Sequence, residues 1–217
     1  MNKFRLEDIQ VSFNGDVVLD IARLEVAPGI VTFISGPNGS GKTTLLRVMA
    51  GLLRPRQGCV SYLGEPILYG RGGVGHRRRV SLLHQDIFMF RGQVIANASL
   101  GMVMRGNSRA EADAKAFQAL ETVGCAHLAG RDAGTLSGGE RKRVAMARAL
   151  ATGAETLLLD EPDAGVDAEN TKQLREVIAA ISRSGKTIVL SSHQPDWPTS
   201  IASDVIQIAY GKLEPRG

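Results

Sequence analysis

The stretch Gly36-Pro37-Asn38-Gly39-Ser40-Gly41-Lys42-Thr43-Thr44 directly follows an apolar run at residues 30–35. This is G-x-x-x-x-G-K-T between a predicted buried strand and the start of a predicted helix, the context in which the pattern indicates a phosphate-binding loop. Glycines let backbone N–H groups approach phosphates, and a helix N-terminus adds positive potential. Lys42 would reach the β- and γ-phosphates, and the Thr43 hydroxyl would take a Mg²⁺ coordination position. A tight turn alone would not explain the Lys-Thr pair, so we expect the chain to bind a nucleoside triphosphate.

Length and composition are those of a soluble globular protein. The chain has 217 residues and 43% hydrophobic content, which fits one large α/β domain or one domain with a small inserted subdomain. No apolar stretch approaches the roughly 18 residues of a membrane-spanning helix. The first eight residues lack an apolar run, so we expect no secretory signal. Cys59 and Cys125 have no metal-ligand spacing, and we expect reduced, buried thiols of a cytosolic protein.

Two basic clusters contribute to the net charge of +4, namely His76-Arg77-Arg78-Arg79 and Arg141-Lys142-Arg143. They fit either a nucleic-acid surface or a solvated loop and the exposed face of a helix. No aromatic residues interleave with them as base-stacking platforms would require, which favours the solvated interpretation. Charge therefore does not decide the function.

The chain before and just after the phosphate loop reads mainly as strand. Residues 4–13 alternate as a strand, and Asn14-Gly15 predicts a hairpin turn before a second strand, so an antiparallel β element precedes the loop. The loop continues into a predicted helix at residues 43–49. Beyond this helix we predict a strand at 59–63, an exposed glycine-rich loop at 69–75 and a short buried strand at 80–83.

Residues 88–150 have helical character instead. Ser108 and Glu111 form a capping-box pattern, and residues 144–151 read as a further helix. Apolar strands then return at 156–159 and 187–190, separated by a helix at about 171–183 that Gly185 would end. Near-continuous apolar strands separated by helices indicate an α/β fold with a mostly parallel sheet.

The apolar strand ends in two acids, in the sequence Leu157-Leu158-Leu159-Asp160-Glu161-Pro162. Asp160 would emerge at the carboxyl end of the sheet, where such folds bind ligands, and could hold Mg²⁺ or its water. Glu161 could orient or deprotonate an attacking water. Acids at a strand end are also common helix N-caps, but beside a phosphate loop the catalytic interpretation is favoured.

A second glycine turn opens a helix at Leu136-Ser137-Gly138-Gly139-Glu140, and its N-terminus is again suited to an anion. Together with the phosphate loop and the acidic strand end, this segment resembles the signature of an ABC ATPase, and the resemblance extends over essentially the whole chain. In that family two cassettes sandwich ATP head to tail. The resemblance therefore implies that Ser137, Gly138, Gly139 and Glu140 contact ATP held by a partner chain.

The smaller motifs of the family match as well. The resemblance implies that Phe13 stacks on adenine, where tyrosine is usual, and that Gln85 touches Mg²⁺ or the attacking water. It implies that His193 contacts the γ-phosphate and that Asp167 belongs to a loop crossing the dimer interface. That loop departs from the common Ser-Ala-Leu-Asp and reads Ala164-Gly165-Val166-Asp167, with Asp163 where Thr or Ser is common.

The resemblance implies one ABC ATPase domain over residues 1–217, with a P-loop NTPase core at 1–87 and 151–217 and an inserted helical subdomain at about 88–150. We expect an ATP- and Mg²⁺-dependent ATPase subunit that powers a membrane transporter, an importer of small solutes or ions loosely similar to the tungstate type. The alternative is a soluble ABC ATPase acting on nucleic acid or ribosomes, but this sequence lacks the second cassette or coiled-coil insertion of those proteins.

The expected partners are a second copy, integral membrane permeases and an extracytoplasmic solute-binding protein, with no nucleic acid. The expected location is the cytoplasmic face of the cell membrane. Phe88-Met89-Phe90 would either receive a permease helix or pack in the core.

Overall fold

The computed structural model describes residues 2–192 and 201–215. Its backbone contacts form two compact units. Unit 1 comprises Met1–Leu82, Glu155–Glu161 and Gly185–Gly217, and unit 2 comprises Leu83–Ala154 and Pro162–Ser184. The helical segment predicted at residues 88–150 falls within unit 2, which also takes in residues 162–184.

Unit 1 contains the predicted antiparallel element as a four-stranded sheet in the order β2-β1-β4-β5. Its strands are β1 (Phe4–Phe13), β2 (Asp16–Val26), β4 (Gln57–Tyr62) and β5 (Glu65–Pro66). The turn between β1 and β2 is formed by Asn14 and Gly15, whose φ angles are 52° and 96°. Two successive positive φ angles are what a tight hairpin with the strand twist requires, so the predicted turn is confirmed.

The second sheet of unit 1 has the order β10-β9-β3-β8-β7-β6. Its strands are β3 (Val31–Ser35), β6 (Val80–Leu83), β7 (Thr156–Asp160), β8 (Thr187–Ser191), β9 (Asp204–Ala209) and β10 (Lys212–Leu213). Strands β9, β3, β8 and β7 pair in parallel, which confirms the predicted α/β class. Because parallel strands end at the same edge of a sheet, Ser35, Asp160 and Ser191 lie together there.

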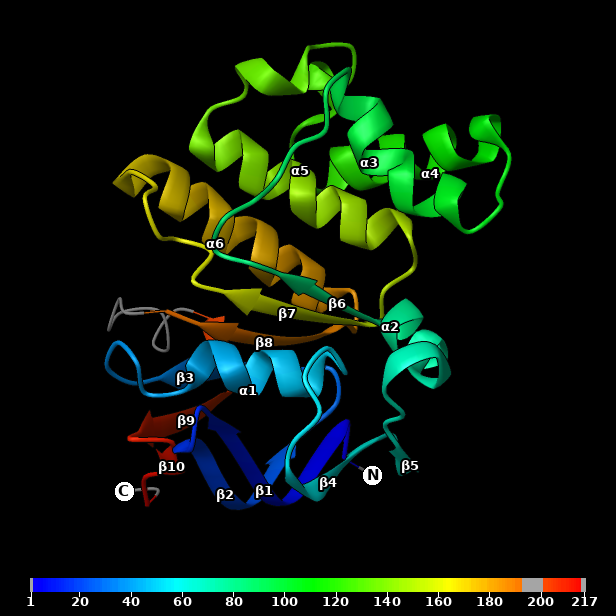
Figure 1. The fold of residues 1–217 in the computed structure, drawn as a ribbon. Helices are drawn as coiled ribbons and strands as arrows, with labels where there is room; N and C mark the ends of the chain where they lie inside the picture. Colours follow the sequence, from blue (N-terminus) through cyan, green and yellow to red (C-terminus); the bar gives the residue numbers. More distant parts are fainter. Residues whose placement is uncertain (1, 193–200, 216–217) are drawn as a thin grey trace. The chain divides into compact units, whose positions relative to one another are not determined.

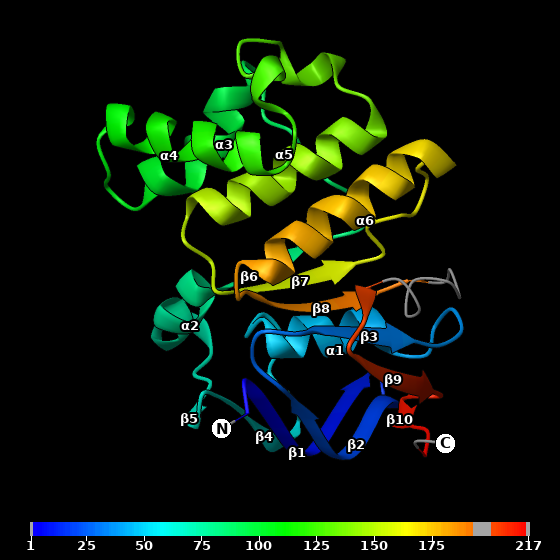
Figure 2. The same cartoon turned by 180° about the vertical axis from the view of Figure 1, so that it is seen from behind.

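Helix α1 (Lys42–Met49) connects the two sheets of unit 1. Its apolar side chains are fully buried in one core with residues of both sheets, including Phe4 of β1 and Leu158 of β7, and Figures 1 and 2 show the helix running between the sheets. This packing fixes the start of α1, and therefore the phosphate loop, at the carboxyl edge of β3.

Unit 2 consists mainly of helices, shown in green to gold in Figures 1 and 2. They are α3 (Val94–Met104), α4 (Arg109–Thr122), α5 (Gly138–Ala151) and α6 (Ala168–Arg183), with short 3₁₀ turns at Ala126–Leu128 and Ala133–Thr135. The predicted capping box is present, since the Ser108 side chain accepts from Glu111 N and Glu111 accepts from Ser108 N. Gly185 follows α6 with φ 83°, as predicted for a residue that ends a helix.

The segment at residues 69–75 is mostly exposed, as predicted, but the predicted loop conformation is wrong. The chain there forms a 3₁₀ turn at Gly70–Gly73 and then the helix α2 (Val74–Arg79). The cause is tertiary packing: the His76 ring contacts Phe4 and Tyr62 edge-on, and His76 Nε2 lies 2.8 Å from Met49 O. Burial lowers the pKa of His76, which favours the neutral ring, and the contacts of this ring anchor α2.

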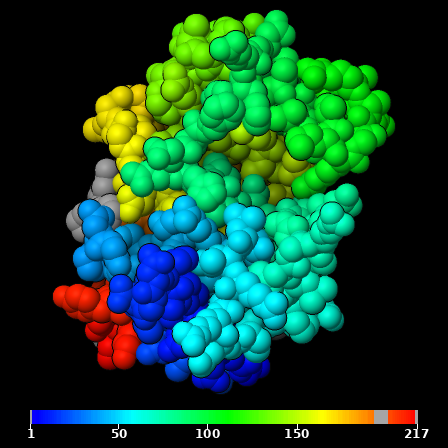
Figure 3. Space-filling view, in the orientation of Figure 1, coloured from blue at the N-terminus to red at the C-terminus, as the bar shows by residue number. Residues whose placement is uncertain are grey.

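Two predictions about burial also need correction. Cys125 is buried as expected, but Cys59 is exposed on β4. In Figure 3 the cyan part of the surface lies beside the blue N-terminal part. The second basic cluster is not an exposed helix face, because Lys142 and Arg143 are only 6% and 9% exposed. Their side chains bond to loop and helix groups within unit 2 instead.

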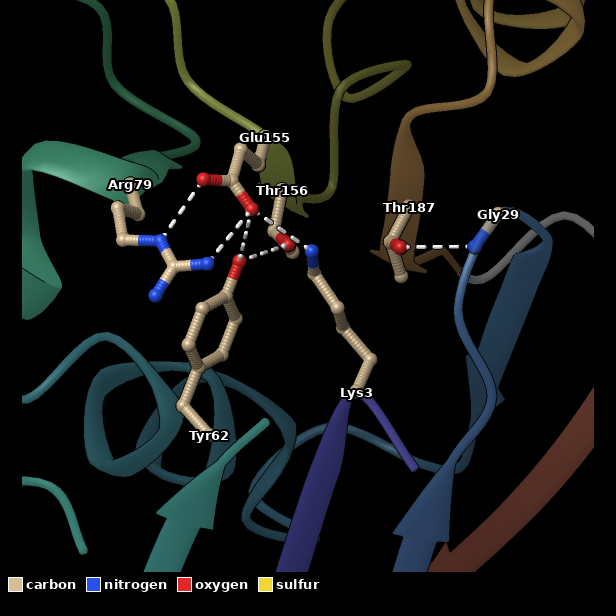
Figure 4. A network of polar contacts seen from close by, with 7 residues as sticks. All are labelled: Lys3, Gly29, Tyr62, Arg79, Glu155, Thr156 and Thr187. Atoms are coloured by element: carbon tan, nitrogen blue, oxygen red, sulfur yellow. Dashed lines mark hydrogen bonds and ion pairs between the residues drawn. The ribbon is translucent and has the colours of Figure 1, made fainter. Parts of the chain in front are cut away.

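Glu155 joins both sheets of unit 1 (Figure 4). Its carboxylate accepts from Lys3 Nζ at 3.1 Å, from Arg79 Nε at 2.8 Å and from Tyr62 OH at 3.4 Å. The Arg79 hydrogen bond is the main cause that lowers the pKa of Glu155 to about 2. These contacts tie β1, β4 and α2 to the residue that precedes β7, at the amino edge of the parallel sheet.

We expect Glu155→Gln to lower the free energy of unfolding by about 1 kcal/mol at pH 7, a value that allows for the partial exposure of the carboxylate. Because the folded pKa lies below the unfolded one, this stabilisation is present above about pH 4.5 and is lost as pH falls toward 2. Urea titrations at pH 7, 5 and 3.5 measure the difference between variant and parent. Glu7→Gln, which removes an exposed pair with Arg5, is the control and should change stability by less than about 0.5 kcal/mol. If the difference in the free energy of unfolding between Glu155→Gln and the parent does not decrease as the pH is lowered, the stabilising role of the Glu155 carboxylate is contradicted.

Candidate functional site

The phosphate loop occupies the turn between β3 and α1, and its glycines are required by the fold. Gly36 and Gly41 have φ angles of 153° and 104°. A Cβ atom at Gly36 would lie 2.1 Å from Ile208 O, and one at Gly41 would lie 2.7 Å from Leu19 Cδ2. The loop is therefore pressed against β9 and β2, and only glycine allows its backbone this approach.

Lys42 begins α1 and folds back over the loop. Its Nζ donates to Gly36 O at 2.9 Å and to Pro37 O at 3.0 Å, and lies 3.8 Å from Glu161 Oε1. The residue is 5% exposed. Burial lowers the pKa of Lys42, while Glu161 and Asp160 oppose that shift. The result is a desolvated ammonium whose hydrogen-bond partners are neutral carbonyl oxygens.

Asp160 is the last residue of β7 and accepts two hydroxyl hydrogen bonds at one oxygen. Thr43 Oγ1 and Ser191 Oγ each donate to Asp160 Oδ1 at 3.0 Å. Asp160 and Ser191 are 4% and 0% exposed. Carboxylate and hydroxyl oxygens are ligands suited to Mg²⁺, which usually keeps water and phosphate oxygens for its other positions. A site with few protein oxygens fits that chemistry. Among the described residues, there is no group of three or more His, Cys, Asp or Glu side chains that could hold a metal ion.

Glu161 follows β7 in a left-handed backbone conformation, with φ 46°. Its N–H donates to Ser191 O at 3.1 Å and lies 3.2 Å from Ser191 Oγ. Such strained conformations persist only where the surroundings hold them, and they concentrate at functional sites. Ser191 thus fixes the backbone of Glu161 and the carboxylate of Asp160 together.

The other predicted residues of unit 1 differ in their exposure. Phe13 ends β1 and is 46% exposed, as an aromatic able to receive a flat base must be. Ser40 is 3% exposed, and its hydroxyl has no hydrogen-bond partner among the described residues. The predicted positions Asn38, Gly39 and Thr44 complete the turn and the first turn of α1.

The glycine turn of unit 2 begins α5. The Ser137 side chain accepts from Glu140 N at 3.3 Å, and Glu140 Oε2 accepts from Ser137 N at 2.7 Å. This second capping box lowers the pKa of Glu140, mainly through the Ser137 backbone N–H. Ser137 is exposed, and its hydroxyl accepts from Glu140 N and also hydrogen-bonds the Glu140 carboxylate.

The sequence model of the ABC transporter family matches residues 19–164, which include the phosphate loop, the glycine turn of α5 and the acidic end of β7. This chain belongs to the ABC transporter family. It binds and hydrolyses ATP as the ATPase subunit of a membrane transporter.

Known members of the family are similar over nearly the full length of the chain. The cobalt import ATP-binding protein CbiO of Rhodobacter capsulatus is 37% identical, with 97% of this chain and 77% of that protein aligned. The tungstate uptake system ATP-binding protein TupC of Peptoclostridium acidaminophilum is 31% identical, with 96% and 95% aligned. The solved structure of cbiO1 from Clostridium perfringens, described as part of the complex cbiONQ, has a TM-score of 0.91 and 28% identity over 100% of this chain and 88% of that chain.

The predicted site residues of this ABC ATPase are divided between the two units. Unit 1 holds Phe13, the phosphate loop, Asp160 and Glu161, while unit 2 holds Ser137 to Glu140, Asp167 and Gln85. Gln85 is exposed two residues after β6, and Asp167 caps α6 by accepting from Asn170 N. His193 lies outside the described residues. Their roles stay predictions.

Sequence reasoning missed Ser191. Ser191 ends an apolar strand, as Asp160 does. A polar residue at the end of an apolar strand is the feature of the sequence that could have indicated a site residue. The hydrophobic pattern alone did not show that β8 is the neighbour of β7.

Proposed function

We propose that this chain is the ATPase subunit of an importer for a small solute or an ion, in which two copies bind ATP head to tail. The observation that carries the proposal is the placement of Thr43, Asp160 and Glu161 beside Lys42 in one unit. The family members compared above are named for cobalt import and tungstate uptake. These names favour import over the alternative of a soluble ATPase acting on nucleic acid.

ATP would lie on the loop of residues 36–44 with its adenine against Phe13. The ammonium of Lys42 would exchange the carbonyl oxygens of Gly36 and Pro37 for oxygens of the β- and γ-phosphates, which are charged and therefore stronger acceptors. Thr43, Asp160 and Gln85 would hold Mg²⁺. That ion supplies charge neutralisation on the phosphate oxygens.

Hydrolysis would begin with a water placed between the Glu161 carboxylate and the γ-phosphorus. Glu161 accepts a proton as the water oxygen bonds to phosphorus, and the bond from phosphorus to the β,γ-bridging oxygen breaks to release ADP. Gln85 and His193 would orient this water and the γ-phosphate. The partner's Ser137, Gly138, Gly139, Glu140 and Asp167 would close the site, with the hydroxyl proton of Ser137 donated to the γ-phosphate.

The chain would act at the cytoplasmic face of the membrane against integral membrane permeases, together with an extracytoplasmic solute-binding protein. No helix of the described residues is both long and apolar enough to cross a membrane, and permease subunits would form the pathway. Phe88 and Phe90 are 70% and 46% exposed and pack edge to face with ring centroids 5.0 Å apart. They offer an apolar contact for such a subunit.

A mixture of two inactive variants tests the head-to-tail arrangement. We expect Ser137→Arg to bind ATP as a monomer but to block its own dimer with a bulky charge. Mixed with Lys42→Ala chains it should form heterodimers with one intact composite site, which occlude about one ATP per dimer. Filter-trapped nucleotide per dimer is the measurement.

The matched control is Ser108→Arg, which removes the same kind of capping box from α4. It should occlude two ATP molecules per dimer, like the parent. Two ATP molecules occluded by Ser137→Arg alone would contradict the sandwich.

A further inference from the structure

Gly139 is the second residue of α5 and faces another helix of unit 2. It has no positive φ angle, so its backbone is compatible with any residue. A Cβ atom there would nevertheless lie 2.6 Å from Asn170 Oδ1, 2.8 Å from Asn170 Cγ and 2.9 Å from Asn170 Cβ. At Gly138 a Cβ atom would meet only Gly165 O, at 3.8 Å. The absence of a side chain at Gly139 is thus required by α6 of the same chain.

Asn170 lies in the first turn of α6 and makes polar contacts in two directions. Its Nδ2 donates to Asp167 Oδ2 at 2.7 Å, and its backbone N–H donates to Asp167 Oδ1 at 2.9 Å. Its Oδ1 accepts from Arg143 Nη1, on α5, at 3.3 Å. The amide therefore presents its donor to a carboxylate and its acceptor to a guanidinium, so its orientation is defined by charge on both sides.

A further contact ties the same two segments together. Lys142 is 6% exposed, and its Nζ donates to Ala164 O in the loop before α6. Lys142 and Arg143 are consecutive residues of α5. The beginning of α5 is thus bonded both to the loop of residues 163–167 and to the first turn of α6.

We propose that Asn170 is a positioning residue, which holds the glycine turn of α5 and the loop ending at Asp167 in one fixed arrangement within the chain. It does so by packing against Gly139 and by bridging Asp167 and Arg143. The consequence for activity rests on the proposed function, because both segments would meet the partner's ATP. Asn170 itself would touch no nucleotide. The alternative is that the contact is ordinary helix packing, in which the amide has no directing role.

An exchange of the two residues tests the contact. Gly139→Ala alone should lower the melting temperature by roughly 3–10 °C, because it overpacks the contact, although alanine favours helix. Asn170→Gly alone removes the bridge. In the double variant Gly139→Ala, Asn170→Gly the three close atoms are gone. Its decrease in melting temperature should therefore be clearly smaller than the sum of the decreases in the two single variants. Additive losses would overturn the contact on which the proposal depends.

Hydrogen exchange separates positioning from simple packing. In Asn170→Ala, the amides of Glu140 and Arg141 should exchange about fivefold or more faster than in the parent, because the turn that they stabilise is released. Gln173→Ala is the matched control: it removes the other acceptor of Arg143 Nη1, at 2.8 Å, but leaves the contacts of Asn170. It should exchange as the parent does. Unchanged exchange in Asn170→Ala, or equal acceleration in both variants, would overturn the proposal.

The functional consequence is measured with the same variants. In Asn170→Ala, the ATP concentration that gives half-maximal occlusion should rise about tenfold, while ATP affinity of the isolated monomer stays at the parental value, because the phosphate loop is in unit 1. Gln173→Ala should leave both unchanged. If the parent itself forms no ATP-dependent dimer, the proposed function fails, and hydrogen exchange still decides whether Asn170 positions the turn. Equal occlusion by Asn170→Ala and parent would overturn the positioning role.

Discussion

Replacement of Lys42 by alanine is expected to weaken ATP binding by roughly 10²-fold or more. The ammonium is 5% exposed and already makes two short hydrogen bonds to the loop. In the complex it would make charge-assisted bonds to phosphate oxygens in a site with little water, and each such bond contributes about 1.5–3 kcal/mol. Equilibrium titration with a fluorescent ATP analogue measures the loss.

Two controls separate this effect from others. Lys172→Ala removes the same charge from an exposed position of α6 and should bind ATP like the parent. Thermal unfolding should show that Lys42→Ala is folded, because the lost contacts lie at the edge of α1 and not in its apolar core. Parental affinity in a folded Lys42→Ala protein would remove the phosphate loop from the mechanism.

The parts of the site that lie on consecutive residues could be predicted from the sequence. Gly36 to Thr44 and the acids after residue 159 are defined by local spacing, and the parallel sheet then necessarily places strand ends at one edge. Local chemistry also predicted the Asn14-Gly15 turn and the Ser108 capping box. In each case the residues that determine the structure lie in one short segment of the chain.

Features that depend on long-range contacts could not be predicted in this way. Ser191 acts on Asp160 and Glu161 only because β8 pairs with β7. In the sequence Lys142 belongs to a basic cluster that is typical of a solvated surface. In the structure its side chain is bonded to Ala164 O in a loop that is distant in sequence. The α2 segment is rich in glycine and arginine, and it becomes helical because His76 packs against Phe4 and Tyr62. Here tertiary packing overrides local preference.

The interaction between Gly139 and Asn170 shows the same limit within a recognised motif. The glycine turn was predicted from its sequence and interpreted as a cradle for an anion. The structure gives the second glycine an additional reason, since its missing side chain makes room for Asn170. Gly139 therefore belongs to the glycine motif and also leaves room for a neighbouring side chain. Only this second requirement depends on which residue occupies position 170.

Replacement of Glu161 by glutamine is expected to slow ATP hydrolysis by about 10²-fold or more while ATP binding is retained. Glutamine has the same size but cannot accept the proton of the attacking water, and a positioned general base contributes about 10²–10⁴ to the rate. The backbone of Glu161 is held by Ser191 rather than by its carboxylate, so the geometry should survive. Steady-state phosphate release measures the rate.

The same variant should accumulate an ATP-bound dimer, because hydrolysis would be the step that separates the two chains. Gel filtration with ATP and Mg²⁺ should show this dimer for Glu161→Gln but not for Glu65→Gln, a control at an exposed residue of β5. ATP affinity should be equal to or above the parental value, since the carboxylate 3.8 Å from Lys42 Nζ repels the triphosphate and its charge is lost. Hydrolysis at the parental rate would show that another group accepts the proton, and that Glu161 has been assigned the wrong role.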